Sequence, residues 1–145
     1  MAGDALAEVP EGFTRFARSS PFLDLLGPVF HRSTDEAQIY ALRIEPRHLN
    51  SRGTAHGGVL ATLCDVALGY GTAYTESPPL PLSTVQLCTD FFAPVALGEW
   101  LEAQVAVERV GRQLAFAGCR LVVAGQAVGT ARAIFFRPAP VATQV

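Results

Sequence analysis

The sequence contains no lysine: all eleven basic residues are arginine, and thirteen acidic residues outnumber them. A net charge of −2 and a pI near 5.9 leave no basic footprint for a nucleic-acid partner. Charged residues make up only 17% of the chain, whereas 50% of its residues are hydrophobic. The 145 residues therefore suit one domain with a sizeable core.

Cysteine is also scarce. Cys64, Cys88 and Cys119 are too few and too widely spaced for a disulfide framework or a CxxC motif, so we expect buried free thiols. No His/Cys/Asp cluster has metal-ligand spacing, and no Gly-rich loop follows a strand, so neither a metal nor a cofactor is expected.

Long hydrophobic runs are missing as well. No segment reaches the roughly 18 consecutive apolar residues of a membrane span. The first thirteen residues lack the basic start and the apolar run of a signal peptide. We therefore expect a cytoplasmic protein that makes no use of a membrane.

The stretch from Gly57 to Tyr74 is apolar nearly all round and predicts one central helix. Its larger side chains recur every three or four residues and predict the face that packs on a sheet: Leu60, Leu63, Ala67, Tyr70 and Tyr74. Small or polar residues predict an opposite face with room for a partner helix or a ligand: Gly58, Ala61, Thr62, Asp65, Gly69 and Thr72.

Strand-like runs flank the predicted helix on both sides. Residues 29–32 and 37–44 predict a hairpin before it. Four longer runs follow it, over residues 82–92, 100–110, 113–123 and 126–136, and tight turns at residues 111–112 and 124–125 make the last three antiparallel. Strands of about ten residues suit a strongly curved sheet that wraps the helix.

The chain predicts a single domain over residues 20–138. An extension over residues 1–19 precedes it, and a frayed tail over residues 139–145 follows. In the extension, Phe13 and Phe16 indicate a short helix after Pro10. A second short helix is expected from Pro21, because proline is favoured at the first helical position.

Gly57 and Asp65 carry the chemistry that the helix offers. Gly57 stands where backbone N–H groups lack helical partners, which makes its N–H a site for an oxyanion. Asp65 is a lone acid that we expect to be buried. Eight residues separate the two, about 12 Å along the helix, whereas reacting groups must lie within roughly 3–3.5 Å of one centre. If both serve one substrate, they come from two chains, which predicts a homodimer with two composite sites.

A motif around these two residues resembles the signature of PaaI-like acyl-CoA thioesterases: Asn50-x-x-Gly53-Thr54-x-His56-Gly57-Gly58-Val59-x-x-x-Leu63-x-Asp65. The hairpin before the helix and the long strands after it also match that group, over roughly residues 25–137. The resemblance implies an α+β hotdog fold, in which a long curved antiparallel sheet wraps one central helix and two chains share a continuous sheet. It implies hydrolysis of an aryl- or medium-chain acyl-CoA to the free acid and CoA.

The resemblance also implies residue roles. Gly57 polarises the thioester carbonyl through its N–H, and Asp65 of the partner subunit acts as general base or nucleophile. His56 fixes the loop and assists polarisation. From the residues alone, His56 is equally a loop histidine without a chemical role, and Cys64, beside Asp65, is a core thiol.

Two further roles follow from the same resemblance. Asn50 helps to position the carbonyl or the leaving thiolate, and Ser83 holds the attacking water beside the acid, with Thr84 as its rival. Without the resemblance, Asn50 reads equally well as a turn residue and Ser83 as a strand-edge residue.

A CoA substrate would need cations for its phosphates. Candidate substrate-binding residues near the motif or at loops and strand ends are Gly58, Arg52, Thr84, Arg109, Arg112 and Arg137. The identity of the acyl group and the association of two dimers into a tetramer, which we expect, stay open. A hotdog hydratase acting on acyl thioesters and a non-catalytic acyl-CoA binder are the competing interpretations.

Overall fold

The computed structural model describes residues 8–139. In chain order it contains β1 (Thr14–Arg15), α1 (Pro21–Leu26), β2 (Phe30–Ser33), β3 (Gln38–Arg43), the 3-10 helix η1 (Pro46–His48), α2 (Gly57–Ala73), β4 (Ser83–Phe91), β5 (Trp100–Val110), β6 (Leu114–Val123) and β7 (Gln126–Phe136). The predicted hairpin, central helix and four long strands are all present, with ends within two residues of those expected. Among residues 8–139, no helix has the length and hydrophobicity needed to cross a membrane.

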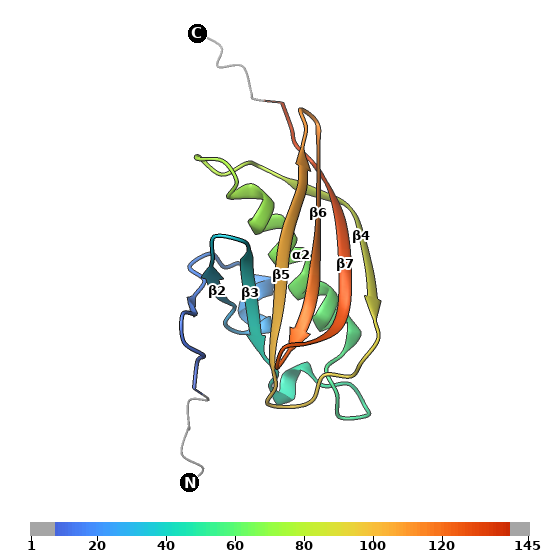
Figure 1. Ribbon diagram of the computed structural model, residues 1–145. Helices are drawn as coiled ribbons and strands as arrows, with labels where there is room; N and C mark the ends of the chain where they lie inside the picture. Colours follow the sequence, from blue (N-terminus) through green and yellow to red (C-terminus); the bar gives the residue numbers. More distant parts are fainter. Residues whose placement is uncertain (1–7, 140–145) are drawn as a thin grey trace.

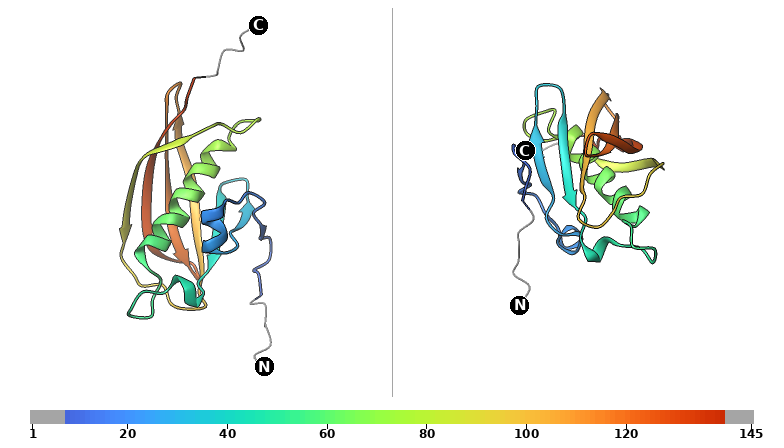
Figure 2. Two further views of the ribbon diagram at one scale, coloured as in Figure 1. Left: turned by 180° about the vertical axis from the view of Figure 1, so that it is seen from behind. Right: turned by 60° about the horizontal axis from the view of Figure 1, so that its bottom comes forward.

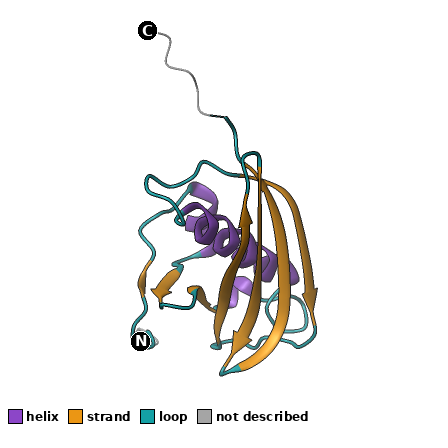
Figure 3. Cartoon of the chain, turned by 45° about the horizontal axis from the view of Figure 1, so that its top comes forward, coloured by secondary structure: helices purple, strands orange, loops and turns teal. Residues whose placement is uncertain are grey.

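The strands form one antiparallel sheet in the order β1-β2-β3-β5-β6-β7-β4 (Figure 1). The sheet curves around α2, which lies against its concave side (Figures 2 and 3). This arrangement confirms the predicted hotdog fold. β4 is the last strand of the sheet, so its outer edge has no partner strand among the described residues.

The face of α2 that packs on the sheet differs partly from the predicted one. The residues of α2 that are buried are Leu60, Leu63, Cys64, Ala67, Leu68, Gly71, Thr72 and Ala73. Tyr74 is exposed and Tyr70 only half-buried, whereas Thr72 is completely buried. Because the helix is apolar nearly all round, the spacing of its large side chains fixed the buried face only to within part of a turn.

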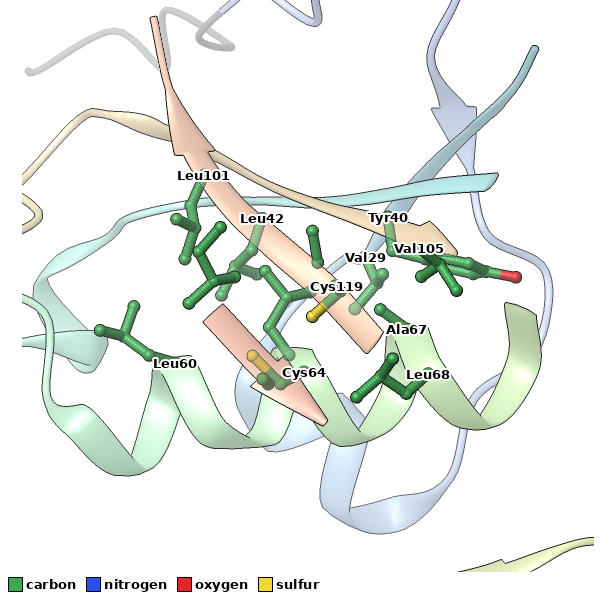
Figure 4. Close-up of a cluster of buried hydrophobic side chains, with 14 of the residues drawn as sticks. Val29, Tyr40, Leu42, Leu60, Cys64, Ala67, Leu68, Leu101, Val105 and Cys119 are labelled. Carbon is green, nitrogen blue, oxygen red and sulfur yellow. The ribbon is translucent and has the colours of Figure 1, made fainter. Parts of the chain in front are cut away.

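Cys64 and Cys119 meet in the core between α2 and β6 (Figure 4). Both are free thiols, and burial beside the Cys119 thiol raises the pKa of Cys64, so it stays protonated. The prediction of buried free thiols is correct for these two and wrong for Cys88, which is exposed. Cys88 alternates with inward-facing neighbours on β4 and so points away from α2.

The N-terminal segment corrects a second prediction. No helix forms near Phe13, because residues 14–15 are extended and pair with β2 as strand β1. Phe13 is buried against the Trp100 ring, with ring centroids 5.2 Å apart, and Phe16 packs on Tyr70 at 4.8 Å. These two aromatic side chains tie the predicted extension to the sheet and to α2. Of the predicted tail, all but Ala139 lies outside the described residues.

Two glycines of α2 allow a specific test of its packing. A Cβ added at Gly71 would lie 2.9 Å from Val105 Cγ1 on β5, whereas one added at Gly69 would meet only the Phe135 ring, at 3.6 Å. The Gly71→Ala substitution should lower the free energy of unfolding by roughly 1–2 kcal/mol, since overpacking outweighs the gain in helix propensity. Urea denaturation measures the change.

Gly69→Ala is the matched control. It makes the same chemical change in the same helix without a clash, so it should leave stability unaltered or raise it by up to about 1 kcal/mol. Equal midpoints and slopes for the two variants would contradict the packing described for Gly71.

Candidate active site

Asp65 lies on the third turn of α2, next to β4, the last strand of the sheet. It is half-buried and accepts a hydrogen bond at 2.8 Å from the Thr84 hydroxyl of β4. The expectation of a buried, isolated acid is therefore wrong in part: within one chain the carboxylate is open on one side and already has a hydroxyl partner.

Thr84, not Ser83, is the hydroxyl residue that contacts Asp65. Ser83 is exposed and pairs with Phe136 in the ladder, while Thr84 pairs with Phe135, whose ring faces the core. Neighbouring residues of a strand point to opposite faces of the sheet. Because Thr84 faces Asp65, Ser83 faces away from it.

A cavity of about 650 Å³ opens beside Asp65. Its lining comes from α1, α2, the segment before β4 and the sheet: Ser20, Phe22, Leu23, Ala61, Thr62, Asp65, Val66, Gly69, Tyr70, Ala73, Leu80, Leu82, Thr84, Leu87 and Phe135. A mostly apolar pocket of this size with few polar groups is typical of a small-molecule site. Phe22 and Tyr70 line this cavity, and Leu25 and Leu26 line a neighbouring one with Phe22 and His56.

The N-terminus of α2 presents one free backbone donor. The Gly58 N–H donates to Nδ1 of His56, at 2.9 Å, so His56 caps the helix through its side chain. The Gly57 N–H has no hydrogen-bond partner among residues 8–139. Because Gly57 has no side chain, its N–H is exposed at the positive end of the helix dipole. A donor in this position suits the negative charge of an oxyanion.

The loop before α2 is organised by side chains. Asn50 Oδ1 accepts from the N–H groups of Arg52 and Thr54, and Asn50 Nδ2 donates to the Thr54 hydroxyl. The structure thus gives Asn50 the turn-forming role, and one amide hydrogen is left for a substrate. Its predicted contact with the carbonyl or thiolate stays a prediction.

Sequence reasoning missed His48. Its ring is 98% buried, accepts from the Glu45 N–H at 2.9 Å, and donates to the Leu26 carbonyl at the end of α1 at 2.6 Å. Its own carbonyl accepts from the His56 N–H at 2.8 Å. His48 therefore joins α1 to the loop that carries Gly57, and nothing in its sequence spacing could have indicated this.

The two halves of the predicted site lie at different places along the chain. The Phe91 ring of β4 packs on Gly57, since a Cβ built there would lie 3.5 Å from it. Thr84, which contacts Asp65, lies seven residues before Phe91 on the same strand. Thr84 and Phe91 are therefore about 23 Å apart along β4. Gly57 and Asp65 of one chain do not meet.

The predicted phosphate-binding arginines also lie apart. Arg52 is exposed in the loop near Gly57. Arg109 and Arg112 are exposed around the β5–β6 turn, and Arg137 nearby contacts Glu76 at 3.5 Å. Among residues 8–139, no group of acidic, histidine and cysteine side chains could hold a metal ion.

Comparisons with known proteins agree with this geometry. The Thioesterase superfamily model matches residues 52–130. A Pseudomonas aeruginosa protein named as a candidate esterase is 46% identical over 134 residues, covering 92% of this chain and 100% of the relative. Human acyl-coenzyme A thioesterase 13 is 31% identical over 113 residues, covering 77% of this chain and 78% of the relative. A solved variant of the phenylacetic acid degradation protein PaaI from Thermus thermophilus aligns at 26% identity with a TM-score of 0.72, covering 82% of this chain and 100% of that one.

Proposed function

Because the chain belongs to the thioesterase superfamily, we propose that it hydrolyses acyl-CoA thioesters with an aryl or medium-chain acyl group. The observation that carries the proposal is the pairing of a free Gly57 N–H with a solvent-accessible carboxylate, Asp65, beside a largely apolar cavity. Human acyl-coenzyme A thioesterase 13 is named for acyl-CoA thioesters, and the PaaI relative for the degradation of phenylacetic acid.

The chemistry divides between the two residues. The thioester carbonyl oxygen accepts from the Gly57 N–H, which stabilises the negative charge that develops there. Asp65 either takes a proton from a water that attacks the carbonyl carbon or attacks it directly to form an anhydride that water then opens. In both cases the carbon–sulfur bond breaks, the CoA thiolate takes up a proton, and the free acid leaves. Thr84 holds the carboxylate, and in the first route also the water.

If Gly57 and Asp65 act on one substrate, their separation within one chain means that a second chain supplies one of them. The edge strand β4 carries Val85 and Phe91, and Phe92 follows its last residue; these side chains are 59%, 39% and 60% exposed, an unusual surface for a strand edge. Antiparallel pairing of β4 with β4 of a second copy would cover this edge and build a two-fold dimer. We infer that this is the dimer, and a further association of two dimers stays a prediction.

The contacts of β4 support one register for the proposed pairing. Asp65 lies at Thr84, and Gly57 lies at Phe91. Residues directly opposite each other in an antiparallel pair point to the same face, and Leu87 faces the cavity while Cys88 faces away. A two-fold axis at Cys88 satisfies both conditions. It sets Phe91 of the partner subunit beside Val85 and Thr84, and so brings Gly57 of the partner subunit to Asp65.

The central test replaces the carboxylate. Asp65→Asn keeps the shape and the hydrogen bond from Thr84 but removes the base, so kcat for a panel of acyl-CoA thioesters should fall by about 10²–10⁴-fold. Thiol release measures the rate, and light scattering checks that the dimer persists. Asp35→Asn, in the exposed β2–β3 turn, is the matched control and should keep full activity. An active Asp65→Asn enzyme would end the assignment.

The hydroxyl next to the acid gives a second prediction. Thr84→Val removes the hydrogen bond to Asp65 at nearly constant volume, and kcat should drop by at least about tenfold. Thr84→Ser should retain most of the activity, and Ser83→Ala should stay within about twofold of the wild type. The reverse order, with Ser83→Ala impaired and Thr84→Val active, would restore Ser83 as the functional hydroxyl.

Cys88 reports directly on the dimer register. Directly opposed residues of antiparallel strands have Cα atoms about 4.5–5.5 Å apart, which is within disulfide range. Mild oxidation should therefore cross-link wild-type chains on a non-reducing gel, and Cys88→Ser should abolish the cross-link, because Cys64 and Cys119 are buried.

A shifted cysteine provides the control for this register. In Cys88→Ser/Gln86→Cys, the new thiols would sit about 13 Å apart across the two-fold axis, beyond the reach of a disulfide. Cross-linking by the double variant but not by the wild type would move the axis and separate Asp65 from Gly57 of the partner subunit.

A further inference from the structure

Gly69 occupies a position in α2 that the packing of the chain does not explain. Glycine in a helix interior costs about 1 kcal/mol relative to alanine. Gly71 has a reason for being glycine, because Val105 Cγ1 would lie 2.9 Å from its Cβ. At Gly69 the nearest atom to an added Cβ is on the Phe135 ring, at 3.6 Å, an ordinary contact. None of the described residues therefore excludes a Cβ at residue 69.

The space at Gly69 belongs to the cavity beside the carboxylate. Gly69 follows Asp65 by four residues, so the two lie one above the other on one face of α2. Both line the cavity of about 650 Å³. A side chain at residue 69 would project into this cavity between α2 and Phe135.

Along α2 and β4, the lining of the cavity is polar next to Asp65 and mostly apolar beyond it. Thr62 and Thr84 line it before and beside Asp65. Beyond Asp65, the segment that leads into β4 runs back along α2, and the Leu80 N–H donates to the Ala73 carbonyl at 2.9 Å. The lining residues on this side are apolar or aromatic: Gly69, Tyr70, Ala73, Leu80, Leu82 and Phe135.

This polarity gives the direction of the substrate. The reacting carbonyl must lie at Asp65 and Thr84, so the part of the acyl group beyond it extends towards the apolar end, past Gly69. From Asp65 to Ala73 the helix rises about 12 Å, which leaves room for a chain longer than acetyl or butyryl.

We propose that Gly69 sets the depth of the acyl pocket and thereby selects medium-chain alkyl or aryl-alkyl thioesters over short ones. The absent side chain keeps the cavity open for one turn of α2 beyond the reacting carbon. This inference rests on the proposed thioesterase function and adds the residue that determines its chain-length preference.

The test fills the cavity at residue 69. Gly69→Leu should lower kcat/KM for octanoyl-CoA and phenylacetyl-CoA, while butyryl-CoA stays within about threefold of the wild type. The octanoyl-to-butyryl ratio of kcat/KM should fall by about 50-fold, because the added side chain displaces roughly three methylenes and each is worth about fourfold. Gly69→Ala, which adds one carbon, should change the ratio by less than about fivefold.

A positional control adds the same group at the other end. Ala61 lines the cavity one turn before Asp65, so Ala61→Leu should leave the octanoyl-to-butyryl ratio within about threefold of the wild type, whatever its effect on the overall rate. The same ratio change in both variants would show that acyl length is not measured at Gly69.

Three other outcomes decide the proposal. An unchanged ratio in Gly69→Leu overturns it. Loss of the dimer in Gly69→Leu, seen by light scattering together with loss of turnover for every substrate, also overturns it, because Gly69 would then serve contact with a second chain. Failure of the wild type to hydrolyse any thioester in the panel would instead reject the thioesterase function itself.

Discussion

The rise of an α-helix is the constraint on which the proposed site depends. Eight residues of α2 hold Gly57 and Asp65 about 12 Å apart, and no rearrangement of side chains brings a backbone N–H that far. β4 repeats the separation on a larger scale, since Phe91 accompanies Gly57 and Thr84 accompanies Asp65. In the proposed site, one chain thus supplies half of each of two sites. The unpaired edge of β4 offers the symmetric contact that joins the halves, so the fold and the need for a second chain have one geometric origin.

At the proposed oxyanion site, the N–H groups next to that of Gly57 already have hydrogen-bond partners. The first four N–H groups of a helix lack partners within its ladder. Within residues 8–139, the Gly57 N–H alone of these four stays open, because the His56 ring accepts from Gly58, the His56 carbonyl from Val59 and the His48 carbonyl from His56. His48 connects the same loop to the end of α1, because both of its ring nitrogens form hydrogen bonds. A donor that stabilises a developing charge is most effective when it is fixed before the reaction, and the hydrogen bonds of these two histidines hold the loop that carries Gly57.

The sequence predicted what depends on local pattern and missed what depends on long-range contacts. Strand and helix periodicity predicted the hairpin, α2 and the four long strands, and the motif singled out Gly57, His56 and Asp65, whose catalytic roles stay predictions. The choice of Thr84 over Ser83 needed the strand's phase, which the irregular pairing between Thr84 and Gln86 obscures. The strand at residues 14–15 forms only because β2 lies beside it, and two aromatic side chains in a short segment suit a helix or a strand equally well.

The composition of α2 shows how one element can be both core and active site. A helix with a single apolar stripe would bury one face and leave the other polar and solvated. α2 is largely apolar on both: leucine, cysteine and alanine are buried in the core, and Ala61, Val66, Gly69 and Tyr70 line the cavity together with Asp65. Its two inner glycines have different effects. Gly71 allows the helix to pack closely on Val105 in the core. Gly69 lowers the helix propensity and leaves space beside the Asp65 carboxylate. Residues that lower stability without improving the packing are expected where a site requires space. Gly69, which the packing of the core does not require, therefore indicates the position of the proposed acyl pocket.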